Sequence, residues 1–214
     1  MRDTNLIRFS LYGFLKNLRF FEPFFLLFLR HKNLTFTEVG VLFAFREICI
    51  NIMGIPSGGL ADIYGRKRTL ILSFVAYIAS FIMLTIASTK PLLYFAIFLF
   101  SIGESFRTGT HKAMIFDYLR ANGLLHDKTR VYGFTRSWSQ LGSALSVLVG
   151  ALLYYHLGSF DSIFLFSVIP YLISIWNLYC YPDWLDKETG PEQGSVSKEK
   201  HKIMRTLKNI CIHL

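Results

Sequence analysis

The sequence predicts an all-α integral membrane protein with six transmembrane helices. Of its 214 residues, 52% are hydrophobic and only 17% are charged, and the apolar residues gather in long runs. A soluble domain would carry about 25% charged residues, whereas a membrane-spanning helix needs roughly 20 predominantly apolar residues. The spans are expected at residues 10–30, 39–61, 70–88, 92–118, 131–155 and 161–181.

The positive charges predict the orientation of these spans. The net charge of +9 suggests nucleic acid as a partner, but its distribution argues against one. If the N-terminus is cytoplasmic, the outside loops hold only Arg30, Lys32 and Lys90, and most of the remaining Lys and Arg residues lie inside. This is the positive-inside bias. We therefore expect both termini in the cytoplasm, a plasma (inner) membrane location and no nucleic-acid partner.

The first span is not a signal peptide, because it is too long and contains Lys16, Arg19 and Glu22. The short loops at 89–91 and 156–160 predict antiparallel hairpins of the third with the fourth span and of the fifth with the sixth. The third span is almost wholly apolar, so we expect it to face lipid or to pack passively.

The composition changes after Pro182. Residues 183–199 are charged and contain Gly and Pro, which predicts a flexible cytoplasmic linker. In residues 200–214 apolar and basic side chains alternate at helical spacing, as in an amphipathic helix on the inner membrane surface. The same period also fits the beginning of a further span, and both alternatives stay open.

A short charged turn separates the second span from the third. Gly58 and Gly65 permit tight turns and close backbone approach. Asp62 lies near Arg66 and Lys67, so a carboxylate and two cations can form a compact ion-pair unit on the cytoplasmic side. A plain stop-transfer turn is the simpler alternative.

The spacing in this turn resembles the loop 2–3 signature of the major facilitator superfamily. Eight positions match it: Gly58, Leu60, Ala61, Asp62, Gly65, Arg66, Lys67 and Leu70. One departure is Ile63, where the family usually has Arg. The resemblance implies the N-terminal six-helix half of a twelve-helix transporter whose two halves rock about a central cavity. It also implies a cytoplasmic gate between halves at Asp62 and Arg66, supported by Gly58, Gly65 and Lys67.

Two further signatures of the family are partial. In the fourth span the expected Arg-x-x-x-Gly appears as Arg107-Thr108-Gly109, and residues 109–117 look like helix 4 of a bacterial branch of the superfamily. In the fifth span Gly142, Ser146 and Gly150 form a small-residue ridge that permits close helix packing. The antiporter signature also requires a Gly-Pro pair, which this span lacks, so the choice among symport, antiport and uniport stays open.

Charged residues inside the spans are costly and are candidates for function. At 1.5 Å per residue, Glu22, Arg46, Glu47 and Glu104 fall near the middle of the membrane, with Arg19 and Arg107 slightly cytoplasmic of it. The candidates for a cavity are Glu22, Arg46, Glu47, Glu104 and Arg107. They could form interhelical ion pairs, or they could line a cavity that binds substrate or carries protons. Because helices 1 and 4 line the cavity in the superfamily, the resemblance favours Glu22, Glu104 and Arg107. In the second alternative, Glu104→Gln would remove a pH dependence of transport.

Spacing also predicts which charges meet. Arg19 with Glu22, and Glu104 with Arg107, are three residues apart and share a helical face. Arg46 and Glu47 are about 100° apart around their helix, so they are expected to point in different directions. Lys16, His111, Lys112, Asp117 and Arg136 lie nearer the cytoplasmic ends, where we expect Asp117 to form a structural clasp with Arg136 or Arg130.

The sequence indicates neither an enzyme nor a cofactor. The three cysteines have no metal or redox spacing, and most histidines occur singly in loops, so no metal site is expected. Ser57 lies in a Gly-rich stretch, but it lacks the spacing and the partner of an intramembrane nucleophile.

The sequence therefore predicts one half of a secondary transporter that moves a small solute, with H⁺ coupling as an option. Its partners would be the lipid bilayer, the solute, and a second six-helix half or a second copy. A non-transporting partner or regulator, or a truncated product, is the alternative. The acids suit a cation, the arginines an anion and the aromatic residues a hydrophobic compound, so the substrate stays open.

Overall fold

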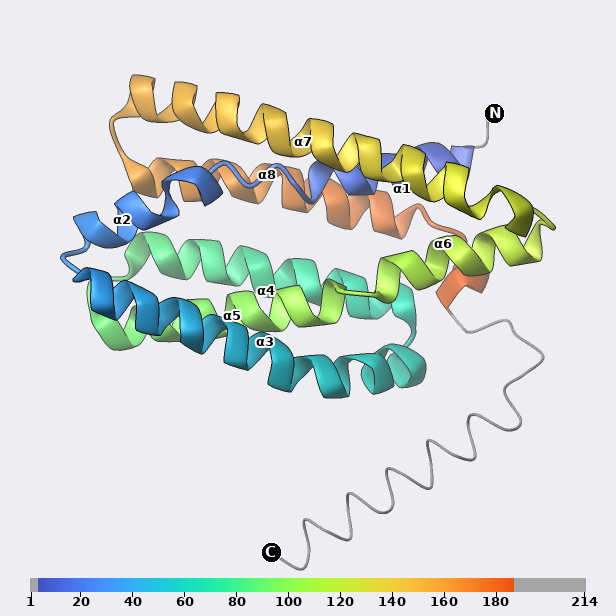
Figure 1. The fold of residues 1–214 in the computed structure, drawn as a ribbon, viewed down its shortest axis with the longest axis horizontal. Coiled ribbons are helices and arrows are strands. Elements are labelled where there is room, and N and C mark those ends of the chain that lie inside the picture. The colour runs from blue at the N-terminus through green and yellow to red at the C-terminus, as the bar shows by residue number, and fades with distance from the viewer. Residues whose placement is uncertain (1–3, 187–214) are drawn as a thin grey trace, which may run out of the picture.

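The computed structural model describes residues 4–186, except for the side chains of Asp62 and Asp183, and this part is helical with no β-strand. The elements are α1 (Thr4–Leu15), η1 (Glu22–Phe24), α2 (Phe25–His31), α3 (Phe36–Tyr64), α4 (Arg66–Ile86), α5 (Lys90–Arg107), α6 (Thr110–Ala121), η2 (Leu125–Asp127), α7 (Lys128–Leu157), α8 (Phe160–Tyr179) and η3 (Asp183–Asp186). Most of the long helices run side by side along one direction (Figure 1).

Two of the six expected spans are not continuous helices. The span expected at 10–30 is divided, because α1 ends at Leu15 and helical structure resumes only at η1, which has Pro23 in its first turn. The span expected at 92–118 breaks between α5 and α6, where Gly109 has a φ of 85°. Among the described residues, four segments are long and apolar enough to cross a membrane: Phe36–Ala61, Arg66–Ile86, Leu125–Leu157 and Phe160–Tyr179. The described residues therefore do not form six unbroken spans.

Local signals account for the ends of two long helices. α3 begins with a capping box, in which the Thr35 hydroxyl accepts from the Glu38 backbone N–H and the Glu38 carboxylate accepts from the Thr35 backbone N–H. α7 ends at Gly158, whose φ of 63° suits a residue without a Cβ. α3 runs on to Tyr64, beyond the end expected at residue 61.

α4 is a central helix of the bundle that packs through one face, while apolar residues such as Leu72 and Ile86 on its other face are exposed. It packs against α5 on one side and α8 on the other, while α3 packs on α5 and α1 on α7 (Figure 1). One stripe of α4 explains this position, because Leu70, Phe74, Tyr77 and Phe81 recur at helical spacing and are fully buried. Tyr171 of α8 makes ring contacts with the three aromatic members of this stripe.

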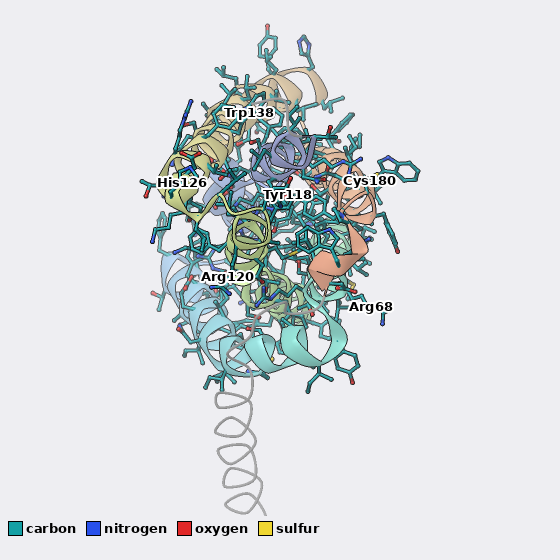
Figure 2. All side chains as sticks on the ribbon, turned by 90° about the vertical axis from the view of Figure 1, so that its right-hand side faces the viewer. Arg68, Tyr118, Arg120, His126, Trp138 and Cys180 are labelled. Carbon is teal, nitrogen blue, oxygen red and sulfur yellow. The ribbon has the colours of Figure 1, made fainter. Side chains whose placement is uncertain are left out.

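The predicted cytoplasmic end of the bundle faces the viewer in Figure 2 and carries Arg68, Arg120 and His126. At this end η3 belongs to the helical unit, since Leu185 is buried. The linker expected at 183–199 therefore begins with residues that are packed on the bundle. The rest of that linker and the amphipathic segment expected at 200–214 lie outside the described residues.

Candidate functional site

A buried charged network joins four parts of the bundle around Glu104 of α5. Its carboxylate accepts hydrogen bonds from Arg19 at 2.7 Å, from Arg107 and from the Tyr77 hydroxyl. Arg19 also donates to the hydroxyls of Tyr171 at 2.9 Å and Tyr77 at 3.1 Å. The network therefore ties the segment after α1 to α4, α5 and α8.

These contacts favour one of the two alternatives for Glu104. The expected pairing of Glu104 with Arg107 is confirmed, and Arg19 lies 3.9 Å from Glu22 as their spacing predicts. Because Glu104 is engaged by two guanidinium groups and one phenol, the geometry supports the interhelical ion pair for this residue. Proton coupling through Glu104 stays a prediction.

The other mid-membrane candidates do not share this site. Arg46 binds the neighbouring Glu47 at 2.7 Å, so the expectation that they diverge was wrong; their long side chains bend across the helix surface. The side chain of Glu22 is 65% exposed. Glu22 and Arg46 instead line a small cavity of about 150 Å³ whose other lining residues are all apolar. The five predicted cavity residues therefore do not form one cavity.

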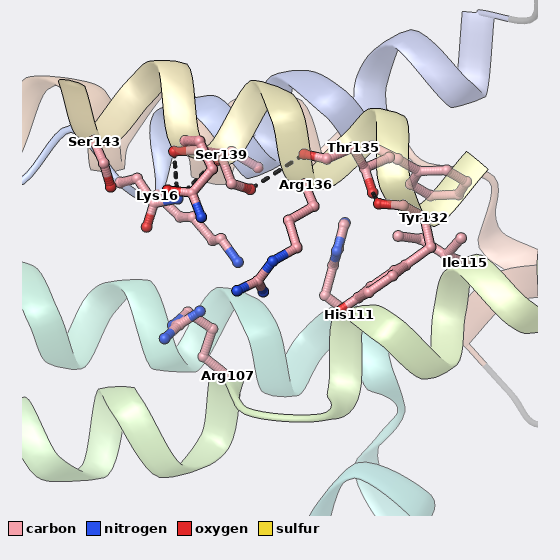
Figure 3. Close-up of a pocket in the computed structure, with 13 residues that line it drawn as sticks. Lys16, Arg107, His111, Ile115, Tyr132, Thr135, Arg136, Ser139 and Ser143 are labelled. Atoms are coloured by element: carbon pink, nitrogen blue, oxygen red, sulfur yellow. Dashed lines mark hydrogen bonds between the residues drawn. The ribbon is translucent and has the colours of Figure 1, made fainter. Parts of the chain in front are cut away.

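A larger polar cavity lies between α1, α5, α6 and α7 (Figure 3). Its volume is about 330 Å³, and its lining consists of Phe9, Gly13, Lys16, Asn17, Arg107, His111, Ile115, Tyr132, Thr135, Arg136, Ser139, Gln140 and Ser143. Of the predicted cavity residues only Arg107 belongs to it. The sequence predicts Lys16, His111 and Arg136 nearer the cytoplasmic ends of their spans, but it does not predict that they line one cavity.

The breaks in the helices position these groups. Lys16 follows the last residue of α1, and Arg107 is the last residue of α5, directly before the break at Thr108 and Gly109. His111, in the first turn of α6, stacks on Tyr12 with ring centroids 3.7 Å apart, and its Nε2 lies 3.2 Å from the Tyr181 hydroxyl. Interrupted helices at membrane depth occur where the backbone borders a cavity or other protein. Gly109, with a φ of 85°, is the sequence signal for the break that directly follows Arg107.

The charged turn between α3 and α4 binds to the end of α8. Gly65 has a φ of 96°, and a Cβ at this position would overlap the carboxylate of Asp186. The same carboxylate accepts from the backbone N–H of Lys67 at 2.8 Å. The ammonium group of Lys67 donates to the carbonyl oxygens of Tyr179 at 3.1 Å and Tyr181 at 3.0 Å, which satisfies groups that the end of a helix leaves unpaired.

Arg66 of the same turn forms an ion pair with Asp117 of α6, which also lies 3.8 Å from Arg120. The expected clasp of Asp117 with Arg136 or Arg130 was therefore wrong, because α6 places its carboxylate against the start of α4 while Arg136 faces the cavity (Figure 3). Arg130 is exposed.

The two remaining residues of the predicted gate lie in α3. Gly58 is inside this helix, and no described atom lies within 4 Å of the position of its missing Cβ, so its supporting role in a gate stays a prediction. Asp62 occupies the last turns of α3, and its side chain lies outside the described residues.

The Arg66–Asp117 pair is expected to stabilise the end of the bundle where α4 meets α6. The two side chains are 11% and 15% exposed, so solvent screens the pair only in part. In a double-mutant cycle with Arg66→Gln and Asp117→Asn, we expect a coupling free energy of about 1–3 kcal/mol from thermal unfolding in detergent. The pair Arg46→Gln and Glu47→Gln is the control, and equal coupling in both cycles would contradict the prediction.

A bundle of apolar helices around a polar cavity, with charged residues at helix breaks, defines an integral membrane protein of the transporter class. The chain belongs to the Major Facilitator Superfamily, whose family model matches residues 9–213. No curated protein matches it.

Solved transporter structures share the fold. A crystal structure of the peptide transporter POT in complex with sulfate superposes with a TM-score of 0.66 at 15% sequence identity, over 98% of this chain and 44% of that one. A POT family transporter in complex with 5-aminolevulinic acid gives a TM-score of 0.61 at 19% identity, over 97% of this chain and 43% of that one. This chain thus spans less than half the length of the transporters whose fold it shares.

Proposed function

We propose that this chain forms one half of a secondary transporter that moves a small solute by alternating access, together with a second six-helix half or a second copy. In this proposal α1, η1 and α2 act as one interrupted span and α5 with α6 as another. Together with α3, α4, α7 and α8, these two interrupted spans make six membrane spans. Both termini would then lie in the cytoplasm, with the charged turn at Gly65 on that side.

The observation that carries the proposal is the polar cavity. It is bounded by α1, α5, α6 and α7, and it lies at the ends of two interrupted spans. Discontinuous helices that border a substrate site are a recurrent feature of transporters. α3 and α7 also expose apolar side chains, among them Ile52, Ile55, Leu148 and Leu152, which lipid or the second half would cover.

The charged turn takes a supporting role in this proposal. Within the described residues, Arg66 and Lys67 contact α6 and the end of α8. We expect the turn to hold the cytoplasmic ends of these helices together, so that this half moves as one body against the other. A direct latch between halves through Asp62 stays a prediction.

Uptake of solute tests the proposal. Proteoliposomes would contain the full chain, alone or with a co-expressed C-terminal half, and uptake of radiolabelled amino acids, dipeptides and carboxylic acids would be measured. We expect uptake of at least one class, and we expect Ser143→Trp to abolish it because the indole fills the cavity that Ser143 lines. Ser137→Trp is the matched control, since Ser137 is exposed on the same helix outside the cavity. Absence of uptake in both preparations, or uptake unchanged by Ser143→Trp, would contradict the proposal.

A further inference from the structure

The polar cavity has a one-sided charge. Lys16, Arg107 and Arg136 extend into the same space from α5, α7 and the segment after α1 (Figure 3). The other residues of its lining are neutral apart from the ionisable His111, and none is Asp or Glu. The cavity wall therefore carries three formal positive charges.

Nearby carboxylates do not balance this charge. Glu104 binds Arg107, but it also binds Arg19, so one carboxylate is shared by two guanidinium groups. Glu22 lies 3.9 Å from Arg19 and is mostly exposed. Between residues 4 and 186, no carboxylate lies within ion-pair distance of Lys16 or Arg136. Lys16 instead lies over the ring of Tyr12, 5.8 Å from its centroid.

Convergent cations repel one another. Lys16 and Arg107 are partly buried, and Arg136 reaches the cavity from an exposed position on α7. Cations near a helix end often extend towards water instead, but Arg107 and Arg136 point towards each other across the cavity (Figure 3). A bound anion would remove the repulsion and accept charge-assisted hydrogen bonds, for which the planar guanidinium is well suited.

The remainder of the lining limits the size and the polarity of that anion. Phe9, Ile115 and Tyr132 form an apolar wall beside the cations. Asn17, Gln140 and Ser143 add neutral hydrogen-bonding groups. A volume of about 330 Å³ is at the lower end of the range for small-molecule sites.

We propose that this cavity binds a small organic anion, with its carboxylate or phosphate group between Lys16, Arg107 and Arg136 and its apolar part against Phe9, Ile115 and Tyr132. This assignment rests on the proposed function, in which the solute passes through this cavity. It names the chemical class of that solute.

Ligand binding to the purified full chain in detergent tests this assignment without requiring transport. The probes are benzoate and phenyl phosphate as anions, benzyl alcohol as the neutral analogue and benzylamine as the cation, followed by calorimetry and thermal shift. We expect the anions to bind and the other two probes not to bind. Arg136→Gln is expected to weaken anion binding about tenfold or more, the loss typical of a charge-assisted contact.

Arg130→Gln is the matched control, because Arg130 lies on the same helix, is exposed and is outside the cavity lining. It removes the same charge, so the effect of net charge alone would appear equally in both variants. Arg136→Lys should restore part of the affinity. Equal binding of benzyl alcohol and the anions, no binding of either anion, or equal losses in the Arg130 and Arg136 variants would each overturn the assignment.

The failure of one proposal is distinguishable from the failure of the other. Anion binding that depends on Arg136, in a chain that moves no solute with or without a second half, would refute transport and leave the anion site intact. Uptake of dipeptides or amino acids that is abolished by Ser143→Trp, with no anion binding, would leave transport intact and refute the anion site.

Discussion

Glu104→Gln is expected to destabilise the folded helical unit by roughly 3–5 kcal/mol, the cost of removing one partner from a buried charge pair. Glu104 accepts from Arg19, Arg107 and Tyr77, and its side chain is 18% exposed. A neutral amide leaves two guanidinium groups facing each other with no carboxylate between them. Thermal unfolding of the purified protein in detergent would measure the loss.

Glu47→Gln is the matched control, because it makes the same change on a carboxylate whose side chain is 56% exposed and whose partner Arg46 is adjacent in the chain. We expect this variant to lose less than about 1 kcal/mol, as surface ion pairs do. Equal losses in the two variants would show that Glu104 does not hold the bundle together. A Glu104→Gln protein of unchanged stability, whose transport lost its pH dependence, would instead favour proton coupling.

Gly142→Ala is expected to force α1 and α7 apart. A Cβ at Gly142 would overlap the carbonyl oxygen of Phe14, and Gly13 on the facing segment would meet Ser139 and the backbone of Thr135 in the same way. Since the obstacle is backbone, no side-chain rotation relieves it, and overpacking of this kind costs about 1–3 kcal/mol or more. We expect a lower unfolding temperature and, because the cavity lies between the same helices, weaker ligand binding.

Gly133→Ala is the control for this substitution, because Gly133 lies on the same helix and has nothing within 4 Å of the added Cβ. There the change should stabilise α7 by about 0.5–1 kcal/mol through helix propensity. If the two variants unfolded at the same temperature, the close approach of α1 and α7 at Gly142 would be refuted.

The helical membrane class and the family were the parts that could be predicted from the sequence, since long apolar runs and the loop signature depend on local composition and spacing. The positions of the breaks were harder to predict. The run from residue 10 to residue 30 is apolar enough to suggest one helix, although Pro23 marks a boundary that the hydrophobic pattern hides. The small-residue ridge of the fifth span was predicted well, because Gly142 and Gly150 are both buried at close helix contacts.

Pairings between distant charges could not be predicted from spacing. The partners of Glu104 include Arg107, which is three residues away, but also Arg19 and Tyr77, which only the packing of α4 brings near. Asp117 was assigned to the wrong arginine because the crossing of α6 over the start of α4 leaves no trace in the sequence. Lys16 and Arg136 were placed nearer the cytoplasmic ends of their spans, which stays a prediction, and their convergence depends on how the interrupted spans meet.

The contacts of Lys67 and Gly65 also have a consequence for how this chain matures as it leaves the ribosome. The corner at Gly65 is synthesised early. The residues that bind Lys67 come much later, because Tyr179, Tyr181 and Asp186 follow Lys67 by 112, 114 and 119 residues. A nascent chain that has not yet reached Tyr179 lacks all three of these acceptors. The corner can therefore close only after the last helix end has been synthesised.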